Sequence, residues 1–323
     1  MSQTIAYLGP QGTFTHAAAL KVAVPDCQLE ALGQVTDVYE MVNSSRARFG
    51  LVAIESSVEG YVVPSLDALA ASANVVAIDE VFVEISFDAF AHKAATGEFT
   101  EVTSHPHGLA QCQGFIDARG LARVPAASNA AACRDVAPHQ IALGPAICGD
   151  LYGLTTVATD VQDFSGARTR FLLITARDTA AEHLAAVRQG SQSPIGLSIA
   201  QATQWHSMIA ITPTVTGPGV LARITREFGR FGVNLSSVIT RPIKALEGKY
   251  TFILTVDQPP WQTELRQVLD RLLAADDALK TLGVFPSRGQ IDDRVDESRL
   301  APGTAYRQLS QAELNRALLW PDR

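Results

Sequence analysis

A glycine-containing turn near the N-terminus is the first segment whose residue types could bind a ligand. Ile5–Leu8 is a short apolar run, and residues 9–13, GPQGT, follow it. A strand, a tight turn and a helix start in this order present free backbone N–H groups, which bind anions. The lysine of a phosphate-binding P-loop is absent. The segment is either an anion site or an ordinary strand-to-helix turn.

Polar residues also follow the strand predicted over 49–54. Glu55, Ser56, Ser57 and Glu59 place two carboxylates and two hydroxyls at the carboxyl end of that strand, where open α/β sheets bind ligands. These groups could bind a substrate or move protons. The alternative is a capped loop with solvated acidic residues.

A third segment has hydrogen-bonding side chains at a strand end and in the first turn of a helix. It reads Ser104-His105-Pro106-His107, and Gln111 follows. Two histidines two residues apart could ligate a metal, but no HExxH motif accompanies them. We therefore expect Ser104 and Gln111 to bind a polar ligand, and we expect neither a metal nor a cofactor.

The fourth segment is Arg168–Phe171, at the start of a strand that continues to Ile174. Alternation along a strand points Thr169 and Phe171 to one face and Arg170 to the other. A Thr hydroxyl can protonate a leaving group whose departure is strongly driven, and an Arg can bind a carboxylate. A salt-bridged surface strand is the alternative interpretation.

Short strands and helices alternate over residues 1–180, and these elements must position the four segments. Helices are expected to begin near residues 15, 36, 66, 108 and 130. This rhythm predicts βαβ units and a largely parallel sheet. The β-rich run over 74–92 and the segment near 155–165 are expected to cross between two lobes. Strands are predicted over 5–8, 29–32, 49–54, 101–104, 141–143, 156–158 and 170–174.

The C-terminal third has a different order of elements. Residues 181–206 lose strand character, and GSQSP at 190–194 is typical of a loop, so we place a linker there. Strand, helix, strand, strand, helix and strand follow over 207–286, which is the βαββαβ order of a ferredoxin-like domain. A polar tail over 287–323 contains one amphipathic stretch at 311–319.

The composition is that of an ordinary soluble protein. Of 323 residues, 47% are hydrophobic and 18% charged, and the formal net charge is -7. That charge offers no sequence-wide attraction to nucleic acid or to anionic lipid, so we expect neither partner. Four cysteines without CxxC spacing, and the lack of a long apolar run or a signal-like start, indicate a cytoplasmic protein with reduced thiols.

Together these segments resemble the prephenate dehydratase family, whose catalytic domain is followed by an ACT domain. The motifs YLGPQGTFTHAAA, Glu55, Glu59-Gly60, Ser104-His105-Pro106, Gln111-Cys112 and Thr169-Arg170-Phe171 occur in the family order. The resemblance implies an α/β fold with two lobes, similar to periplasmic binding proteins, and the decarboxylating dehydration of prephenate to phenylpyruvate. Prephenate is poised to aromatise, so the protein needs mainly to orient it and to assist the leaving hydroxyl.

The resemblance also implies roles for individual residues. Thr169 is the proton donor to the departing ring hydroxyl, and Glu55, Ser104 and Gln111 surround the substrate. Arg170 and the 9–15 turn are the expected partners of the two substrate carboxylates. The substrate-binding residues so implied are Gly12, Thr13, Ser56, Ser57, Ser128, Asn129, Arg170 and Phe171.

The chain departs from the family motifs in the catalytic part, and three of the departures replace a polar residue of the family. Ser56 stands where the family has Asn in Pro-Ile-Glu-Asn-Ser, Asn129 where it has Thr in Ser-Thr-Ala, and Ala167 where it has Asn two residues before the catalytic Thr. These replacements leave the rate and the choice between prephenate and arogenate open.

The C-terminal module resembles an ACT domain through the sequences at 217–221, 232–235 and 241–242. The resemblance implies an aromatic amino-acid effector, phenylalanine in the family, at an interface within a homodimer or homotetramer. Residues 239–242, ITRP, lack the Glu of the family's Glu-Ser-Arg-Pro. The effector-binding residues so implied are Gly219, Val220, Leu221, Asn234, Leu235 and Arg241.

Two other functions stay open on the sequence alone. A prephenate decarboxylase of the kind found in antibiotic pathways resembles the same family but does not aromatise the ring. Thr169 argues for the dehydratase, whereas Ser56 and Ala167 keep this alternative. A non-catalytic sensor with two lobes and an ACT domain is the alternative from a different class.

Overall fold

The computed structural model describes residues 3–23, 26–188, 204–289, 300–306 and 308–319. The chain forms two compact units, Met1–Arg288 and Gly289–Arg323. The first unit contains two α/β lobes followed by a βαββαβ module, which confirms the fold class predicted from the sequence.

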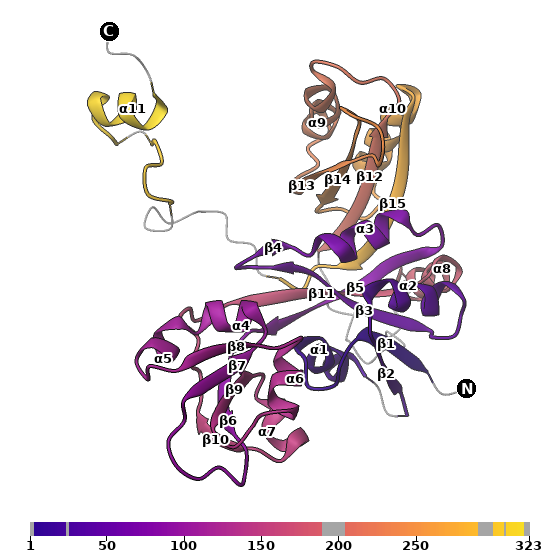
Figure 1. Ribbon diagram of the computed structural model, residues 1–323. Helices are drawn as coiled ribbons and strands as arrows, with labels where there is room; N and C mark the ends of the chain where they lie inside the picture. Colours follow the sequence, from indigo (N-terminus) through magenta and orange to yellow (C-terminus); the bar gives the residue numbers. More distant parts are fainter. Residues whose placement is uncertain (1–2, 24–25, 189–203, 290–299, 307, 320–323) are drawn as a thin grey trace. The chain divides into compact units, whose positions relative to one another are not determined.

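The first lobe is a sheet with helices on both faces (Figure 1). β1 pairs in parallel with β2 and with β3, while β11 lies antiparallel between β3 and β5. The sheet of this lobe is therefore parallel, as expected, except for β11 and the short β4, which pairs antiparallel with β3. The elements are β1 (Thr4–Leu8), α1 (Phe14–Val22), β2 (Gln28–Leu32), α2 (Val35–Asn43), β3 (Phe49–Ser56), β4 (Gly60–Tyr61), α3 (Val63–Ala71), β5 (Val75–Glu84), β11 (Arg168–Ala176) and α8 (Arg177–Arg188).

The second lobe has its own five-stranded sheet, in the order β10-β6-β9-β7-β8. β7 is parallel to β8 and β9, whereas β6 is antiparallel to β9 and β10. The elements are β6 (Asp88–Ala91), β7 (Glu101–Ser104), α4 (Pro106–Gln111), α5 (Gln113–Asp117), β8 (Ala122–Pro125), α6 (Asn129–Arg134), β9 (Gln140–Gly144), α7 (Ile147–Tyr152) and β10 (Thr155–Ala158).

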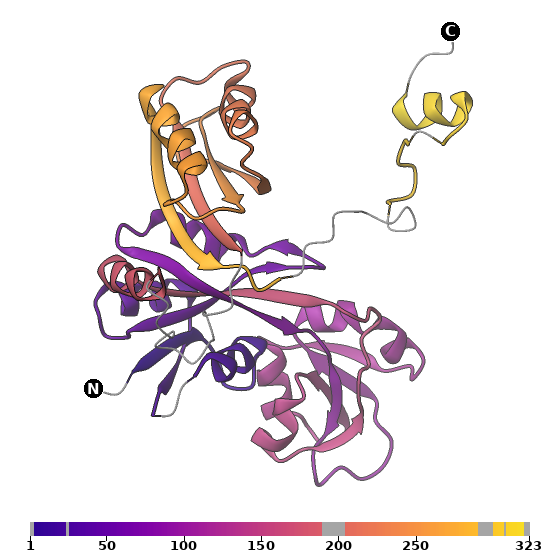
Figure 2. The same cartoon turned by 180° about the vertical axis from the view of Figure 1, so that it is seen from behind.

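Two chain crossings join the lobes and lie side by side (Figures 1 and 2). The chain leaves the first lobe after β5 and returns into β11. The two crossings hydrogen-bond to each other, with Ile85 N donating to Ala167 O at 2.7 Å and Val161 N to Phe87 O at 2.8 Å. A paired crossing restricts the relative movement of the lobes more than a single strand would.

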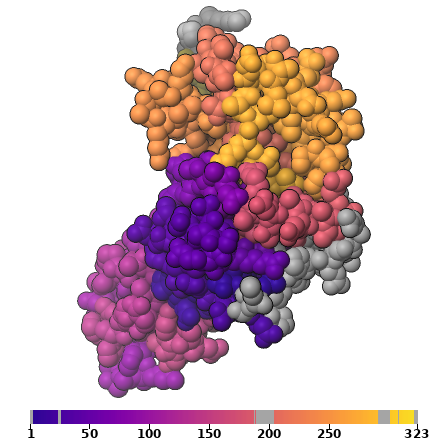
Figure 3. Space-filling model, turned by 90° about the vertical axis from the view of Figure 1, so that its right-hand side faces the viewer, coloured from indigo at the N-terminus to yellow at the C-terminus, as the bar shows by residue number. Residues whose placement is uncertain are grey.

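The module after the lobes continues the sheet of the first lobe. Its elements are β12 (Trp205–Pro213), α9 (Val220–Arg230), β13 (Leu235–Pro242), β14 (Tyr250–Val256), α10 (Thr263–Ala274) and β15 (Asp277–Pro286). The full strand order is β13-β14-β12-β15-β5-β11-β3-β1-β2, with β4 beside β3. In the space-filling view the surface of the module continues into that of the first lobe (Figure 3).

A glycine makes the junction between β15 and β5 possible. Gly283 pairs with Ala77 in parallel register. A Cβ at Gly283 would lie 2.6 Å from the Cβ of Ala77 and 3.0 Å from its carbonyl oxygen, closer than real contacts allow. A larger residue would therefore force β15 away from β5.

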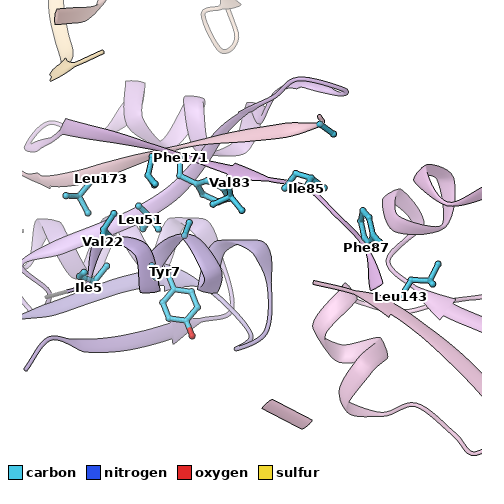
Figure 4. Close-up of a cluster of buried hydrophobic side chains, with 14 of the residues drawn as sticks. Ile5, Tyr7, Val22, Leu51, Val83, Ile85, Phe87, Leu143, Phe171 and Leu173 are labelled. Atoms are coloured by element: carbon cyan, nitrogen blue, oxygen red, sulfur yellow. The ribbon is translucent and has the colours of Figure 1, made fainter. Parts of the chain in front are cut away.

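The two faces of the first-lobe sheet bury different cores. Phe171 and Leu173 on β11 belong to a cluster with Tyr7 and Leu51 that continues through Phe87 into the second lobe. Val83, Ile85 and Phe87 follow one another from the first lobe toward Leu143 of the second (Figure 4). Leu172 and Ile174 face the opposite cluster, which contains α2 and α3 residues together with Phe285 of the module.

The segment expected to be a loop after residue 180 begins as a helix. α8 extends to Arg188, and its buried residues include Ala180 and His183. The sequence ARDTAAEHLAAVR is rich in strong helix formers, so loss of strand character there meant a helix and not a loop. Residues 189–203, with the predicted GSQSP loop, lie outside the described residues, and β12 begins at Trp205.

The expected helix over 108–118 is also divided. α4 ends at Gln111 and α5 starts at Gln113. The side chain of Asp163 accepts hydrogen bonds from Gln113 N at 2.8 Å and Gly114 N at 2.9 Å, which caps α5 from outside the helix. A carboxylate about 50 residues away thus replaces the helical hydrogen bonds at the break.

The second unit contains the predicted amphipathic helix, α11 (Gln311–Leu318). Ser310 and Glu313 form a reciprocal capping box at its start.

Candidate active site

Thr169 lies at the start of β11 on the face whose core continues into the second lobe. It pairs with Ser56 of β3 and Val83 of β5. A double hydrogen bond fixes the backbone beside it, since Arg168 N donates to Ser57 Oγ at 2.9 Å and Ser57 N donates to Arg168 O at 2.9 Å. Thr169 is partly exposed, and in the described part of the chain its hydroxyl has no hydrogen-bond partner. The hydroxyl is therefore available to a ligand.

Arg170 points to the opposite face, and its partners differ from those expected. Its Nε donates to Glu80 Oε2 at 2.7 Å, and its Nη1 lies 3.5 Å from Glu55 Oε2. The Phe285 ring lies beneath the guanidinium at 5.4 Å. The sequence assigned Arg170 to a substrate carboxylate and Glu55 to the catalytic set. The structure instead pairs them with each other on the face that carries the module.

A β-bulge explains the position of Glu55. Arg170 pairs with Glu55, while Phe171 pairs with Ala53, so Ile54 has no counterpart on β11. One extra residue places Ile54 and Glu55 on the same side of the sheet. Phe171 itself is 1% exposed and packs in the core, so it shapes the site through packing.

Ser104 and Asn129 form a buried pair in the second lobe. The Ser104 hydroxyl lies 2.9 Å from Asn129 Oδ1 and 2.8 Å from Leu143 O, and its single proton can serve one acceptor at a time. His105 N also donates to Asn129 Oδ1 at 3.1 Å. Asn129 thus fixes the end of β7. Ser128 caps α6 by accepting from Ala131 N, which is a structural role.

The hairpin between β3 and β4 connects the first lobe to α4 of the second. Glu59 accepts from Gln111 Nε2 at 3.3 Å and lies 2.8 Å from His107 Nδ1. Ser56 Oγ accepts from the backbone N–H groups of Val58 and Glu59, so Ser56 shapes the hairpin. The structure therefore brings Gln111 to the hairpin but occupies its amide with Glu59.

The 9–13 turn is held from the second lobe. Gly12 has φ +87°, and a Cβ there would lie 3.1 Å from Tyr152 and 3.2 Å from Cys148. Tyr152 donates to Gln11 O at 2.6 Å, and the Cys148 thiol donates to Gly12 O at 3.2 Å. Thr13 caps α1 by accepting from His16 N. Gly12 and Thr13 therefore lie where the N-terminus of α1 meets the second lobe.

Burial controls the ionisation of groups behind this turn. His16 Nδ1 accepts from Gly12 N at 3.1 Å, which requires a neutral ring, and burial lowers the pKa of His16. Burial, together with the neighbouring Tyr152, raises the pKa of Tyr7 to about 12. Desolvation lowers the pKa of His105, as does His107, while Glu59 opposes them. Neutral His16 and Tyr7 side chains add no charge at the turn, so an anion bound there would be held by backbone N–H groups.

Comparison with known proteins gives the family. The prephenate dehydratase family model matches residues 5–179. A prephenate dehydratase of Corynebacterium glutamicum is 30% identical over 311 residues, which cover 92% of each chain. The chain belongs to the prephenate dehydratase family.

Solved structures agree with this membership. An Arthrobacter aurescens prephenate dehydratase in complex with L-Phe matches with a TM-score of 0.73 and 29% identity, covering 98% of this chain and 97% of the other. A quorum-quenching acylase matches with a TM-score of 0.72 and 21% identity over 88% of this chain and 98% of the other. The second similarity shows the fold alone, and a fold of this kind can host more than one activity.

The C-terminal module of this family member contains a small cavity. Its volume is about 330 Å³, at the lower end of typical ligand pockets, which range from about 300 to 1,000 Å³. Of the residues expected to bind an effector, Val220 lines it. Arg241 instead pairs with Asp67 of α3 at 2.8 and 2.7 Å, and Asn234 donates to Asp257. The cavity is lined by Pro213, Thr216, Gly217, Val220, Gly248, Tyr250 and Phe252.

The other three expected effector residues lie near the start of α9 and β13. Gly219 is the N-cap of α9 with φ +85°, Leu221 is exposed, and Leu235 packs against the module core. None of these three lines the cavity, which is built from the turn before α9 and the start of β14. The motifs that predicted the effector residues, at 217–221, 232–235 and 241–242, include no residue of β14.

The sequence interpretation also missed two buried acids. Asp79 and Glu80 are 0% and 1% exposed, and both contact Arg288. They interrupt the apolar run VVAIDEVFVEI, and two charges inside an apolar strand require buried partners. From this interruption of the apolar run, the buried ion pairs of Asp79 and Glu80 could have been predicted.

Two absences complete the description of the site. Within the described ranges, no three His, Cys, Asp or Glu side chains are grouped to hold a metal ion. The same ranges contain no helix whose length and apolar character would let it cross a membrane.

Proposed function

We propose that this protein is a prephenate dehydratase, which converts prephenate to phenylpyruvate, carbon dioxide and water. The observation that supports this most is the state of Thr169. Glu55, Ser104 and Gln111 are all engaged with protein groups, whereas the Thr169 hydroxyl has no partner in the described residues. A free hydroxyl on the family's catalytic strand fits a proton donor.

Thr169 assists the departure of the ring hydroxyl. The electron pair of the bond to the lost carboxylate enters the ring as the C–O bond breaks, and the ring becomes aromatic. The leaving oxygen takes the Thr169 proton and departs as water, and solvent returns a proton to Thr169. A weak acid is sufficient here because aromatisation drives the step.

The substrate carboxylates need partners other than Arg170, which Glu80 and Glu55 hold on the opposite face. Thr13 already caps the N–H of His16, and His16 accepts from that of Gly12, so the N–H groups of Phe14 and Thr15 at the start of α1 are the ones proposed to bind an anion. The Gln111 amide is a further donor once it leaves Glu59. Ser57 and Asn129 keep the adjacent backbone in place.

The module over 207–286 is proposed to be an ACT domain that binds L-phenylalanine and lowers turnover. The apolar cavity beside Val220 and the L-Phe complex of the Arthrobacter aurescens relative support this. We further propose that the protein acts in the cytoplasm as a homodimer or homotetramer. Light scattering of the purified chain with and without L-phenylalanine measures the assembly.

Product analysis tests the activity. Purified full-length protein is incubated with prephenate, and the products are separated and identified. Phenylpyruvate formed faster than in the buffer control supports the proposal. A non-aromatic keto acid with release of carbon dioxide would assign a decarboxylase, and unchanged prephenate would assign a binding protein without catalysis. Arogenate in a parallel incubation decides the substrate preference.

A further inference from the structure

Glu80 is a buried carboxylate that contacts two parts of the molecule at once. Its Oε2 accepts from Arg170 Nε at 2.7 Å, and its Oε1 accepts from the backbone N–H of Arg288 at 2.7 Å. Arg170 belongs to the strand that carries Thr169, and Arg288 follows β15, the last strand of the module. One side chain therefore joins the end of the module to the catalytic strand, where β15 meets β5 (Figure 1).

A second β-bulge lies in β5, directly before the two buried acids Asp79 and Glu80. Leu173 pairs with Asp79 and Ile174 with Ala77, so Ile78 has no counterpart on β11. The bulge lies directly before Asp79, and Asp79 accepts from Arg288 Nε at 2.7 Å and Nη2 at 3.0 Å. Desolvation raises the pKa of Asp79, and the Arg288 contact opposes that rise.

The neighbours of Arg170 leave it little freedom. Glu80 holds one edge of the guanidinium, Glu55 lies near another, and Phe285 of β15 lies beneath it. Arg170 is the residue after Thr169, so a change in its position rotates or shifts the peptide that carries the Thr169 side chain. Buried ion pairs of this kind have discrete arrangements and can transmit a displacement between elements.

We propose that Glu80 is a positioning residue that couples the end of the module to Thr169 through Arg170. The inference rests on the proposed dehydratase activity. Glu80 does not touch the substrate, because it lies on the opposite side of the sheet from Thr169. Its removal therefore lowers kcat through the orientation of Thr169 and leaves KM for prephenate within about 2-fold, since the proposed anion-binding turn is in another part of the lobe.

A double-mutant cycle on the full chain tests the coupling. Glu80→Gln removes the charge and keeps the shape, and Arg288→Met removes the module-side partner. We expect kcat to fall about 10-fold in Glu80→Gln, about 3-fold in Arg288→Met, and about 10-fold in the double variant, because both changes interrupt one path. Glu84→Gln, on the same strand but exposed, is the matched control and keeps wild-type kcat.

The outcomes separate this inference from the proposed function. Wild-type protein without turnover overturns both. Active wild-type protein with Glu80→Gln equal to Glu84→Gln, or with a double variant reduced about 30-fold as independent effects multiply, overturns the coupling alone. If Glu80→Gln or Arg288→Met fails to fold by circular dichroism, Glu80→Asp and Arg288→Lys replace them. These retain the charges but alter the reach, so the same non-additivity is required.

Discussion

The two faces of β11 have different surroundings, although Thr169 and Arg170 are consecutive residues of one motif. Thr169 faces the core that runs into the second lobe, and its hydroxyl has no partner among the residues that the structure describes, whereas Arg170 faces the module and is bound by two carboxylates. The proposed mechanism requires a polar group that is open to a ligand on the first face. The proposed coupling requires fixed partners on the other face, so under these proposals consecutive residues of one motif serve chemistry and positioning separately.

Removing Arg170 should have the largest effect on stability. Arg170→Ala leaves Glu80 buried without its cation, and breaking such a pair costs about 3 to 5 kcal/mol. Urea unfolding followed by circular dichroism measures the free energy of unfolding. Arg168→Ala is the control, because Arg168 is exposed and its guanidinium stacks on Phe82, a contact that contributes about 1 kcal/mol or less. Equal losses in both variants would mean that the buried ion pair of Arg170 contributes no more than an exposed arginine on the same face of β11.

Gly283→Ala should have the next largest effect, at the junction of module and lobe. The new Cβ would clash with Ala77, and overpacking of this kind costs about 1 to 3 kcal/mol. Ala77→Gly in the same chain removes the opposing Cβ and should recover part of the loss. Urea unfolding of both variants checks this, and a double variant no more stable than Gly283→Ala would contradict the contact.

The free energy of unfolding should also depend on pH through His183, which α8 buries in the first lobe. His183 is 5% exposed, and neither ring nitrogen has a hydrogen-bond partner among the described residues. Burial, and then Arg48, lowers the pKa of His183. The unfolded chain thus binds the proton more tightly, so the contribution is complete above the unfolded pKa near 6.5 and is lost as pH falls toward the folded pKa.

His183→Leu should therefore reduce the acid sensitivity. Between pH 7.5 and 5.5 the wild type should lose up to about 1.4 kcal/mol more than the variant, the limit for one proton over one pH unit. Unfolding free energies at the two pH values measure the difference. The same slope in both proteins would show that His183 does not take part.

The smallest effect is expected at the hairpin that connects the lobes. Glu59 and His107 are both well exposed, and exposed ion pairs contribute less than about 1 kcal/mol. Glu59→Gln should therefore change the free energy of unfolding by less than that amount. A loss of several kcal/mol would place this contact among the buried interactions instead.

The sequence predicted the elements well where the pattern was local. Strands such as β1 and β3 are apolar runs ended by turn residues, and the order of the module follows from its periodicity. Alternation also separated Thr169 from Arg170 correctly. It did not say which face is the substrate side, so the assignment of Arg170 to a substrate carboxylate stays a prediction, and the contacts of Arg170 with Glu80 and Glu55 were not anticipated.

The features that the sequence did not predict depend on residues that are far apart in the chain. The bulges at Ile54 and Ile78 change the face of Glu55 and Asp79, and only the pairing with β11 reveals them. The break after Gln111 depends on Asp163 in the return crossing. No local window of sequence contains these partners.

Turnover of prephenate by Thr169→Val is the most direct test of the central claim, that the Thr169 hydroxyl is the proton donor. Valine keeps the branched shape on β11 and lacks only the hydroxyl. We predict that kcat falls at least about 100-fold while the free energy of unfolding is unchanged, and that Thr169→Ser retains most activity. A Thr169→Val enzyme with nearly wild-type kcat would contradict the account.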